Sequence, residues 1–306
     1  MIVVEKRTWV QDRPASYSVA GAGMPVVLLH GWALAQHTYR AVIEAIAEQG
    51  CLVIAPALPG FGGTAELPSS SFSLAGYARW VADLLEVLEI DEPVVLVGHS
   101  FGGGVSVRVA HDHRVRVRSM VLVNSIGGSS WRKGDAVHSI AERPLWDWGL
   151  HLPADVWPIR QASRVLPVLA EDLLPNLLRR PRAVVKVANL ARRADVRAEL
   201  ETLRDGGLPI TIIWGTRDGI IPRESFEALC VASGVEGTVV DGSHSWLLAD
   251  PDRFGEVITN DVRIAQAARD MERRPEPTKR RGLRRVATLR GQADAGPQSG
   301  DHLAGG

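Results

Sequence analysis

The sequence predicts an α/β protein with a mostly parallel β-sheet, and three observations support this fold class. Short runs rich in valine, isoleucine and leucine alternate with longer segments of helical spacing. Each apolar run ends near glycine, proline or a polar turn residue, as expected of a strand buried on both faces. Regular alternation of strand and helix indicates parallel strands joined by right-handed crossovers.

Six apolar runs are predicted to be buried strands: Val26–Leu29, Leu52–Ala55, Val94–Val97, Met120–Val123, Ile210–Trp214 and Thr238–Val240. We expect helices over residues 73–89, 101–113 and 246–265 because apolar side chains recur there with helical spacing. Ser73 is a plausible N-cap for the first of these helices. The first 20 residues are predicted to form an opening pair of strands.

The alternation breaks in the middle of the chain and ends before the C-terminus. Residues 126–206 have helical patterns over 162–178 and 182–204 but no clear strand, which predicts a helical insertion lying over the sheet. The last segment is rich in Arg, Gly and Pro, a composition that predicts disorder. The predicted division is a core of residues 1–125 and 207–268, an insertion of residues 126–206 and a basic tail of residues 269–306.

The charge of the chain is balanced in total but uneven along its length. Hydrophobic residues make up 45% and charged residues 23% of the 306 residues, as in ordinary globular proteins. Residues 273–290 hold eight basic groups and one acid, so the rest of the chain carries 27 basic and 34 acidic groups and a net charge of −7. This distribution does not indicate a nucleic-acid-binding core. The tail could touch an anionic membrane or nucleic acid, and an inert solvated tail is the preferred interpretation.

Cysteine content and hydropathy predict a cytoplasmic protein. The two cysteines, Cys51 and Cys230, are too few for a disulfide framework and are interpreted as reduced structural thiols. Glu5 and Lys6 come too early for the apolar core of a signal peptide. No stretch approaches the roughly 18 apolar residues of a membrane-spanning helix. We expect no cofactor and no metal, and leave the oligomeric state open.

The pentapeptide Gly98-His99-Ser100-Phe101-Gly102 has the G-x-S-x-G pattern of a serine nucleophile. A buried strand precedes it and a helical pattern follows, which is the strand-turn-helix setting that exposes the hydroxyl. Gly98 and Gly102 are needed because residues on either side of such a turn crowd each other. We expect the side chain of His99 to leave the turn on a different side from that of Ser100.

Backbone donors for an oxyanion are predicted at two places. His30-Gly31-Trp32 follows a buried strand, and the glycine permits an unusual backbone turn there. The N–H groups of Trp32 and Phe101 are then expected to share the oxyanion. His30 is interpreted as a structural histidine that braces this loop.

The base and the acid are sought at later strand ends, because ligands in open α/β sheets lie beyond the carboxyl ends of the strands. His244 follows the last predicted strand, and Asp218 follows the strand before it. Serine requires a neighbouring histidine to remove its proton, and the histidine requires a carboxylate on its other nitrogen. Asp241 and Asp250 compete as the acid but are interpreted as turn or cap residues. An acid after Met120–Val123 is also conceivable, but that position is Asn124.

Four segments together resemble the signature regions of the α/β-hydrolase family. They are, in chain order, His30-Gly31, Gly98-His99-Ser100-Phe101-Gly102-Gly103, Trp214-Gly215-Thr216-Arg217-Asp218 and Gly242-Ser243-His244. Residues 59–63 also resemble the glycine loop of that family, although Ala57 stands where many relatives have Asp. The resemblance covers about residues 1–268 and implies a mostly parallel eight-stranded sheet with a helical cap after the sixth strand. It also implies membership in the serine-nucleophile, esterase- or lipase-like branch.

The predicted function is hydrolysis of ester-like bonds in a small to medium apolar substrate through an acyl-enzyme. Aspartate-nucleophile relatives are disfavoured because residue 100 is Ser. C–C bond hydrolysis or cofactor-free peroxidation with the same three residues stays open, as does a non-catalytic ligand-binding homologue. Arginines between residues 179 and 197 are interpreted as a solvated helix face. Candidate substrate-binding residues are Trp32, Trp131, Trp146, Trp148 and Trp157. The last four lie in the insertion and could instead pin the cap to the sheet.

Overall fold

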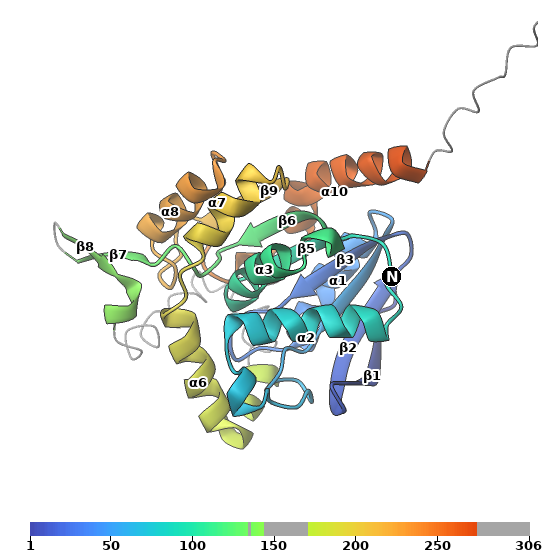
Figure 1. Ribbon diagram of the computed structural model, residues 1–306, viewed down its shortest axis with the longest axis horizontal. Coiled ribbons are helices and arrows are strands. Elements are labelled where there is room, and N and C mark those ends of the chain that lie inside the picture. The colour runs from blue at the N-terminus through green and yellow to red at the C-terminus, as the bar shows by residue number, and fades with distance from the viewer. Residues whose placement is uncertain (134–135, 144–170, 274–306) are drawn as a thin grey trace, which may run out of the picture. The chain divides into compact units, whose positions relative to one another are not determined.

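An eight-stranded sheet forms the centre of the computed structural model, which describes residues 1–133, 136–143 and 171–273 (Figure 1). The strands lie in the order β1-β2-β4-β3-β5-β6-β9-β10. Their bounds are β1 Val4–Val10, β2 Arg13–Gly21, β3 Met24–Leu29, β4 Cys51–Pro56, β5 Val94–His99, β6 Val117–Val123, β9 Ile210–Gly215 and β10 Thr238–Val240.

The sheet is mostly parallel, as predicted. β1 pairs antiparallel with β2, and β2 pairs antiparallel with β4. The pairs β3–β4, β3–β5, β5–β6, β6–β9 and β9–β10 are all parallel. Each of the six predicted strands lies within an observed strand, and the opening pair is confirmed as β1 and β2.

Helices cover both faces of the sheet. They are α1 Arg40–Ala47, α2 Leu74–Val87, α3 Phe101–Asp112, α6 Pro181–Arg192, α7 Arg197–Asp205, α8 Arg223–Ser233, α9 Trp246–Ala249 and α10 Pro251–Arg273. Short 3₁₀ turns occur at η1 Gln36–Tyr39, η2 Ser69–Ser71, η3 Arg114–Arg116 and η4 Ile140–Glu142. The helix predicted over 73–89 is α2, and the Ser73 hydroxyl accepts a hydrogen bond from the Gly76 N–H at 3.0 Å, which confirms the N-cap.

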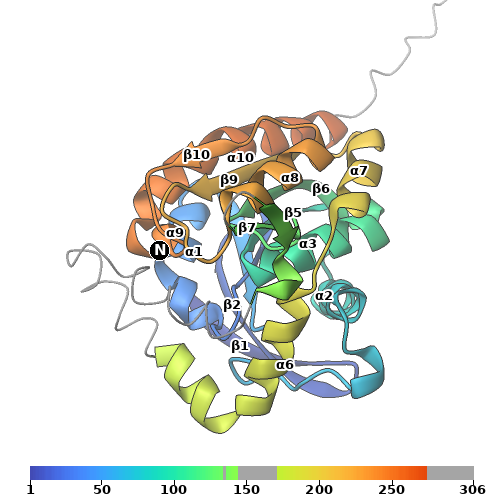
Figure 2. The same cartoon turned by 90° about the vertical axis from the view of Figure 1, so that its left-hand side faces the viewer.

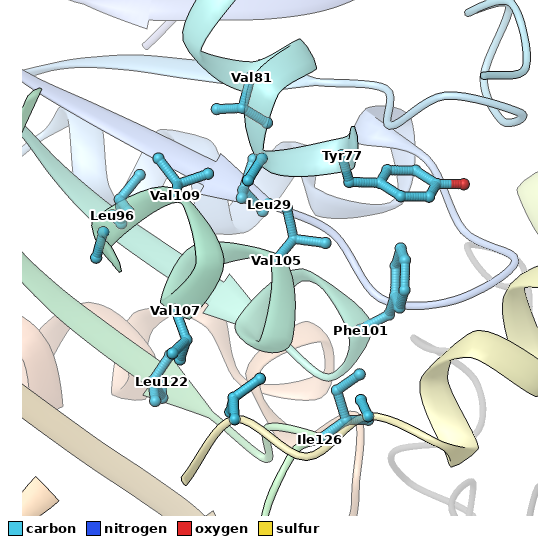
Figure 3. Close-up of a cluster of buried hydrophobic side chains, with 14 of the residues drawn as sticks. Leu29, Tyr77, Val81, Leu96, Phe101, Val105, Val107, Val109, Leu122 and Ile126 are labelled. Atoms are coloured by element: carbon cyan, nitrogen blue, oxygen red, sulfur yellow. The ribbon is translucent and has the colours of Figure 1, made fainter. Parts of the chain in front are cut away.

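The two faces of the sheet have separate apolar cores because successive strand residues point in opposite directions. Leu96 and Leu122 pack with α2, α3, α7 and α8, whereas Val95 and Val121 pack with α1, α9 and α10. Figure 3 shows part of the first core, in which side chains from β3, β5 and β6 meet those of α2 and α3. This packing fixes the strand ends that carry the chemistry.

Two details of the predicted insertion differ from expectation. Residues predicted to contain no strand include the antiparallel hairpin of β7 (Ser130–Lys133) and β8 (Ala136–Ser139). Their sequences, SWRK and AVHS, contain no continuous apolar run of the kind that predicted the other strands. The predicted 182–204 helix is two helices, α6 and α7, with a break at 193–196, and residues 171–179 are also helical. Residues 144–170 lie outside the described chain.

The C-terminal helix extends past residue 268, where we expected the core to end. α10 runs to Arg273 because ion pairs hold its last turns in place of apolar contacts. Arg269 binds Glu92 through two hydrogen bonds of 2.7 Å, and Arg118 binds Glu272 at 2.9 Å. The rest of the predicted tail, residues 274–306, lies outside the described chain.

Candidate active site

Ser100 sits at a strained turn between β5 and α3. Its backbone has φ of 53° and ψ of −116°, a left-handed conformation that non-glycine residues rarely adopt. The Ser100 N–H donates to the Val123 carbonyl at 3.0 Å, which ties the turn to β6. A Cβ added to Gly98 would lie 2.6 Å from the Gly102 carbonyl oxygen. The expected crowding around the serine is therefore present, and both glycines are sterically required.

The structure brings Ser100, His244 and Asp218 into one hydrogen-bonded chain. The distance from Ser100 Oγ to His244 Nε2 is 2.9 Å, and the distance from His244 Nδ1 to Asp218 Oδ2 is 2.8 Å. Because the carboxylate is an acceptor, the proton of the neutral ring lies on Nδ1 and Nε2 accepts from the serine hydroxyl. All three side chains are buried. The arrangement can move a proton from the serine to the imidazole while the carboxylate stabilises the imidazolium.

The Asp218 carboxylate is held by four donors. Oδ1 accepts the Ile220 and Ile221 N–H groups, both at 2.8 Å. Oδ2 accepts from His244 and also from Asn124 Nδ2, at 2.6 Å. The side chain is completely shielded from solvent. Its orientation toward His244 is therefore fixed by the loop after β9 and by the end of β6.

Asn124 is a site residue that sequence reasoning passed over. Besides binding Asp218, its amide nitrogen donates to the Ser243 carbonyl at 3.3 Å, and its amide oxygen accepts the Trp246 indole N–H at 3.2 Å. It thereby joins the acid to both sides of the loop that carries His244. The only signal in the sequence is its place at the end of a strand, where a carboxylate would have been a candidate acid and an amide is not.

Asp241 and Asp250, the two competing candidates for the acid, form other interactions. Asp241 is exposed and forms an ion pair with Arg217. The Asp250 carboxylate accepts the Arg253 N–H at 3.2 Å and so caps the start of α10. Both serve as the turn or cap residues that the sequence interpretation gave them.

The predicted oxyanion donors lie near the serine. A Cβ added to Gly31 would lie 3.3 Å from Ser100 Cβ, so the loop after β3 runs directly beside the nucleophile turn. Within the described chain, the N–H groups of Trp32 and Phe101 donate to no backbone or side-chain oxygen. Phe101 opens α3, where first-turn N–H groups are without intrahelical partners. Their service as oxyanion donors stays a prediction.

A buried tyrosine links this loop to the backbone of His244. The Tyr39 hydroxyl accepts the Gly31 N–H at 2.9 Å and donates to His99 Nδ1 at 2.5 Å. His99 Nε2–H then donates to the His244 carbonyl at 3.0 Å. Burial, together with the nearby His244, holds the pKa of His99 well below its usual range, so the ring is neutral and has the acceptor that Tyr39 requires. His99 thus leaves the turn away from Ser100, as expected, and supports the position of His244.

We expect Tyr39→Phe to lower the free energy of unfolding by roughly 1–3 kcal/mol, because it leaves the Gly31 N–H and His99 Nδ1 buried without a partner. A several-fold lower kcat on an ester substrate should accompany the loss, since the loop and His244 are then less firmly placed. Urea unfolding and steady-state kinetics measure the two effects. Tyr17→Phe is the matched control, because the Tyr17 hydroxyl has no hydrogen-bond partner within the described chain. Equal stability of the two variants would contradict the prediction.

His30 braces the loop after β3 and does not act as a base. Its Nδ1–H donates to the Gly31 carbonyl at 2.8 Å, and its Nε2 accepts the Leu58 N–H at 2.8 Å. Burial lowers the pKa of His30 to about 4. The ring is therefore neutral in the folded protein at physiological pH, and the structural interpretation of His30 agrees with these contacts.

Lowering the pH should reduce the free energy of unfolding because His30 becomes protonated more readily in the unfolded chain. Above pH 6.5 the ring is neutral in both states, whereas below that pH the unfolded chain binds a proton that the folded chain accepts only near pH 4. The stability contributed by neutral His30 is thus lost as pH falls from 6.5 to 4, by up to about 3 kcal/mol. Urea unfolding of wild type and His30→Gln between pH 7 and 4.5 measures the difference. The variant should show a slope smaller by about 1.4 kcal/mol per pH unit, and an unchanged slope would exclude this role.

Two of the five tryptophans that were predicted to bind substrate, Trp32 and Trp131, lie within the described residues. The Trp32 indole N–H donates to the Val184 carbonyl of α6 at 2.8 Å, which ties the loop after β3 to the insertion. The Trp131 ring lies 5.8 Å from the Arg143 guanidinium. Trp146, Trp148 and Trp157 lie outside the described residues. Substrate contact by any of the five remains a prediction.

Arg143 was not singled out from the sequence, yet it holds the loop that carries the acid. Its guanidinium donates to the carbonyls of Ile220 and Gly219, both at 2.9 Å, and the side chain is buried. These carbonyls follow Asp218 directly in the chain. Arg143 therefore supports the acid loop over a separation of more than 70 residues, which no local pattern indicates.

Comparison with known proteins identifies the family. Residues 26–257 match the sequence profile of the alpha/beta hydrolase family. The chain is 30% identical over 302 residues to an uncharacterised protein of Mycobacterium tuberculosis, covering 91% of this chain and 86% of that protein. It is 26% identical to the pimeloyl-[acyl-carrier protein] methyl ester esterase of Aeromonas hydrophila, covering 79% and 96%. A bromoperoxidase structure from Bacillus anthracis superposes with a TM-score of 0.67 at 20% identity, covering 85% and 100%. The chain belongs to the alpha/beta hydrolase family.

The described residues contain neither a membrane-spanning helix nor a cluster of metal ligands. No helix there has the length and hydropathy to cross a membrane. No three His, Cys, Asp or Glu side chains in those residues come together as metal ligands would. Burial raises the pKa of Cys51 and of Cys230 to about 11, so neither thiol is activated as a nucleophile.

Proposed function

We propose that this protein hydrolyses carboxylic esters of small to medium apolar substrates through an acyl-enzyme. The hydrogen-bonded chain from Ser100 through His244 to Asp218 carries the proposal. It combines a nucleophile, a base and an orienting acid at the carboxyl ends of parallel strands.

In the first half of the proposed reaction, Ser100 Oγ attacks the ester carbonyl carbon while His244 Nε2 takes the hydroxyl proton. The negative charge that develops on the carbonyl oxygen is stabilised by the N–H groups of Trp32 and Phe101, at about 3 kcal/mol for each donor. The tetrahedral intermediate then expels the alcohol, which receives the proton from His244. The acyl group remains on Ser100.

In the second half, water attacks the acyl carbon as His244 accepts one of its protons. The second tetrahedral intermediate collapses when Ser100 Oγ leaves and regains a proton from the imidazolium. The carboxylic acid is released and the three side chains return to their starting states. Asp218 stabilises the imidazolium in both halves without itself taking a proton.

An ester is preferred as the substrate class because of the chemistry of one relative. The Aeromonas hydrophila protein, similar over most of both chains, is named a methyl ester esterase. The tryptophans of residues 126–206, which are predicted to bind substrate, would suit an apolar acyl group.

We also propose that residues 126–206 form a cap over the site. Asp172, in the helical segment 171–179, accepts the Ala35 N–H at 3.1 Å and the Thr38 hydroxyl at 2.6 Å. With the bond from Trp32 to Val184, these contacts hold the insertion against the loop that follows β3. That loop carries one proposed oxyanion donor, so the cap would border the acyl-binding side of the site.

A panel of p-nitrophenyl esters with acyl chains of two to twelve carbons tests the proposal. We expect saturable hydrolysis with an optimum at a short or medium chain, because the pocket is proposed to be small and apolar. Absence of hydrolysis across the panel by folded protein would contradict it. Turnover of a vinylogous 1,5-diketone, or of peroxide with bromide, under those conditions would instead support the C–C hydrolase or the peroxidase alternative.

A further inference from the structure

The outer face of the proposed cap exposes an apolar cluster. The helical segment 171–179 and α6 follow one another in the chain and lie together at the lower edge of the molecule in Figure 2. Their inner faces are buried through residues such as Asp172, Val184 and Val187. Their outer faces expose Leu174 (53%), Leu177 (48%), Leu178 (72%) and Val185 (55%).

Exposed large apolar side chains also occur near the N-terminus, at Met1, Ile2 and Val4, but those of the cap lie on helices. Leu174, Leu177 and Leu178 have the i, i+3, i+4 spacing that places them on one side of a helix. Val185 lies seven residues after Leu178 on the next helix, α6, beside a hollow of about 400 Å³ that Pro181, Arg182 and Lys186 also line. Large apolar side chains gathered in this way on a protein surface mark an interaction site more often than isolated ones do.

Basic side chains accompany the cluster. Residues 171–193 contain six basic and two acidic residues. Of these, Asp172 is buried, and Arg180 and Arg192 donate to the carbonyls of Thr64 and Arg143. The exposed charged side chains that remain are Glu171, Arg179, Arg182, Lys186 and Arg193. The two segments that carry the apolar residues therefore expose four cations and one acid, on a chain that is net negative outside residues 273–290.

We propose that this cap face, defined by Leu174, Leu177, Leu178, Arg182, Val185 and Lys186, docks on the surface of an anionic lipid membrane. An apolar helical face bordered by Lys and Arg is the composition that binds at a lipid interface. Apolar side chains enter the region between headgroups and acyl chains, while the cations contact lipid phosphates. The proposal requires no membrane-spanning helix and does not depend on the reaction at Ser100.

Charge favours a membrane over a second copy of this chain. In a two-fold dimer the same patch would meet itself, so Arg182 and Lys186 of one copy would face like charges. Lys186 also lies 5.8 Å from the Phe72 ring, but that contact leaves the lysine exposed. An anionic lipid surface complements both the apolar and the cationic residues of the cap face.

Vesicle flotation with the full-length protein tests the proposal. Vesicles of phosphatidylcholine alone are compared with vesicles that also contain phosphatidylglycerol, at low and at physiological salt. Wild type should float with the anionic vesicles and not with the neutral ones. The double variant Leu177→Glu/Leu178→Glu should bind at least about tenfold more weakly, because it puts charge where apolar area would be buried in the membrane. Arg182→Glu/Lys186→Glu should weaken binding by about fivefold or more for each residue.

Val231→Glu, at a position 78% exposed on α8, is the matched control and should bind as wild type does. Circular dichroism and hydrolysis of a soluble p-nitrophenyl ester establish that the variants are folded, and inactivity of all of them would count against the proposed reaction alone. Failure of wild type to bind anionic vesicles at low salt would overturn the membrane proposal. So would unchanged binding by both cap variants, which would assign the interaction to the basic residues at 273–290. A dimer in solution that the leucine variant dissociates would assign the face to a second copy.

Discussion

Ser100→Ala is expected to lower kcat for p-nitrophenyl ester hydrolysis by four to six orders of magnitude, roughly the loss seen when a triad nucleophile is removed. Ser100 Oγ is the hydroxyl within hydrogen-bond distance of His244 Nε2. Alanine removes the attacking atom and leaves no substitute in its position. The substitution should preserve the fold, because alanine can take the same backbone conformation as serine at no greater cost than serine itself.

Covalent labelling gives a second, substrate-independent measurement of the same variant. A fluorophosphonate probe should modify wild type at Ser100 and leave Ser100→Ala unmodified. Ser233→Ala is the matched control: the Ser233 hydroxyl is also buried, and it donates to the Leu229 carbonyl at 2.7 Å in α8. Labelling that persists in Ser100→Ala would show that another residue is the nucleophile. A folded wild type that resists the probe would favour a non-catalytic ligand-binding protein.

The parts of the site that the sequence predicted are those set by local geometry. Ser100 was recognisable because a buried strand, a G-x-S-x-G turn and a helix follow one another within a few residues. Asp218 and His244 were recognisable because each follows a strand, and parallel strands bring their carboxyl ends to one edge of the sheet. In these cases a short pattern determines the backbone, and the backbone determines where the side chain lies.

The parts that were missed depend on contacts between distant segments. Asn124 touches Asp218 only because β6 and β9 are neighbours, with Val123 opposite Ile213 in the register. Tyr39 is bound to His99 across 60 residues of chain. The spacing of residues along the sequence carries no information about which side chains meet at such distances. The number of strands and their parallel pairing could be predicted, but not the hydrogen-bond partners at their ends.

The end of α10 shows the same limit for the fold. The apolar periodicity that predicted a helix fades near residue 268, and the ion pairs of Arg269 and Glu272 extend the helix to Arg273. Ion pairs with partners on other elements leave no periodic apolar signal. The β7–β8 hairpin was missed for a related reason, since its strands, with the sequences SWRK and AVHS, contain no apolar run like those of the predicted strands.

Asp218→Asn is expected to lower kcat by about 10⁴-fold with little change in KM, because it favours the wrong tautomer of His244. The backbone N–H groups of Ile220 and Ile221 require an oxygen at the Oδ1 position, so the new amide nitrogen must take the Oδ2 position. There it would donate to His244 Nδ1, and the ring proton would move to Nε2. A protonated Nε2 cannot accept the proton of Ser100.

Because of Asn124, Asp218→Asn should also lower the free energy of unfolding, beyond the effect of losing a charge. The Asn124 Nδ2–H donates to the same Oδ2 position at 2.6 Å, so two amide donors would face each other in a buried site. Asn124→Ala in the Asp218→Asn background removes this conflict, together with the bonds to Ser243 and Trp246, and should not recover activity. In wild type, Asn124→Ala should reduce kcat by about tenfold, because Asp218 keeps its other three donors, which include His244.

Steady-state kinetics and urea unfolding of the single and double variants measure these effects, with Asp241→Asn as the matched control. Asp241 also follows a strand near His244, but its carboxylate is exposed and paired with Arg217, so its loss should leave kcat within about twofold of wild type. Activity of Asp218→Asn above a tenth of wild type would mean that another carboxylate orients the imidazole. The effect of Asp241→Asn in that background would then identify it. Asp218→Asn and Asp241→Asn should differ because a carboxylate strongly stabilises the imidazolium only where water is excluded and its oxygens are held in place by hydrogen bonds. Asp218 meets both conditions.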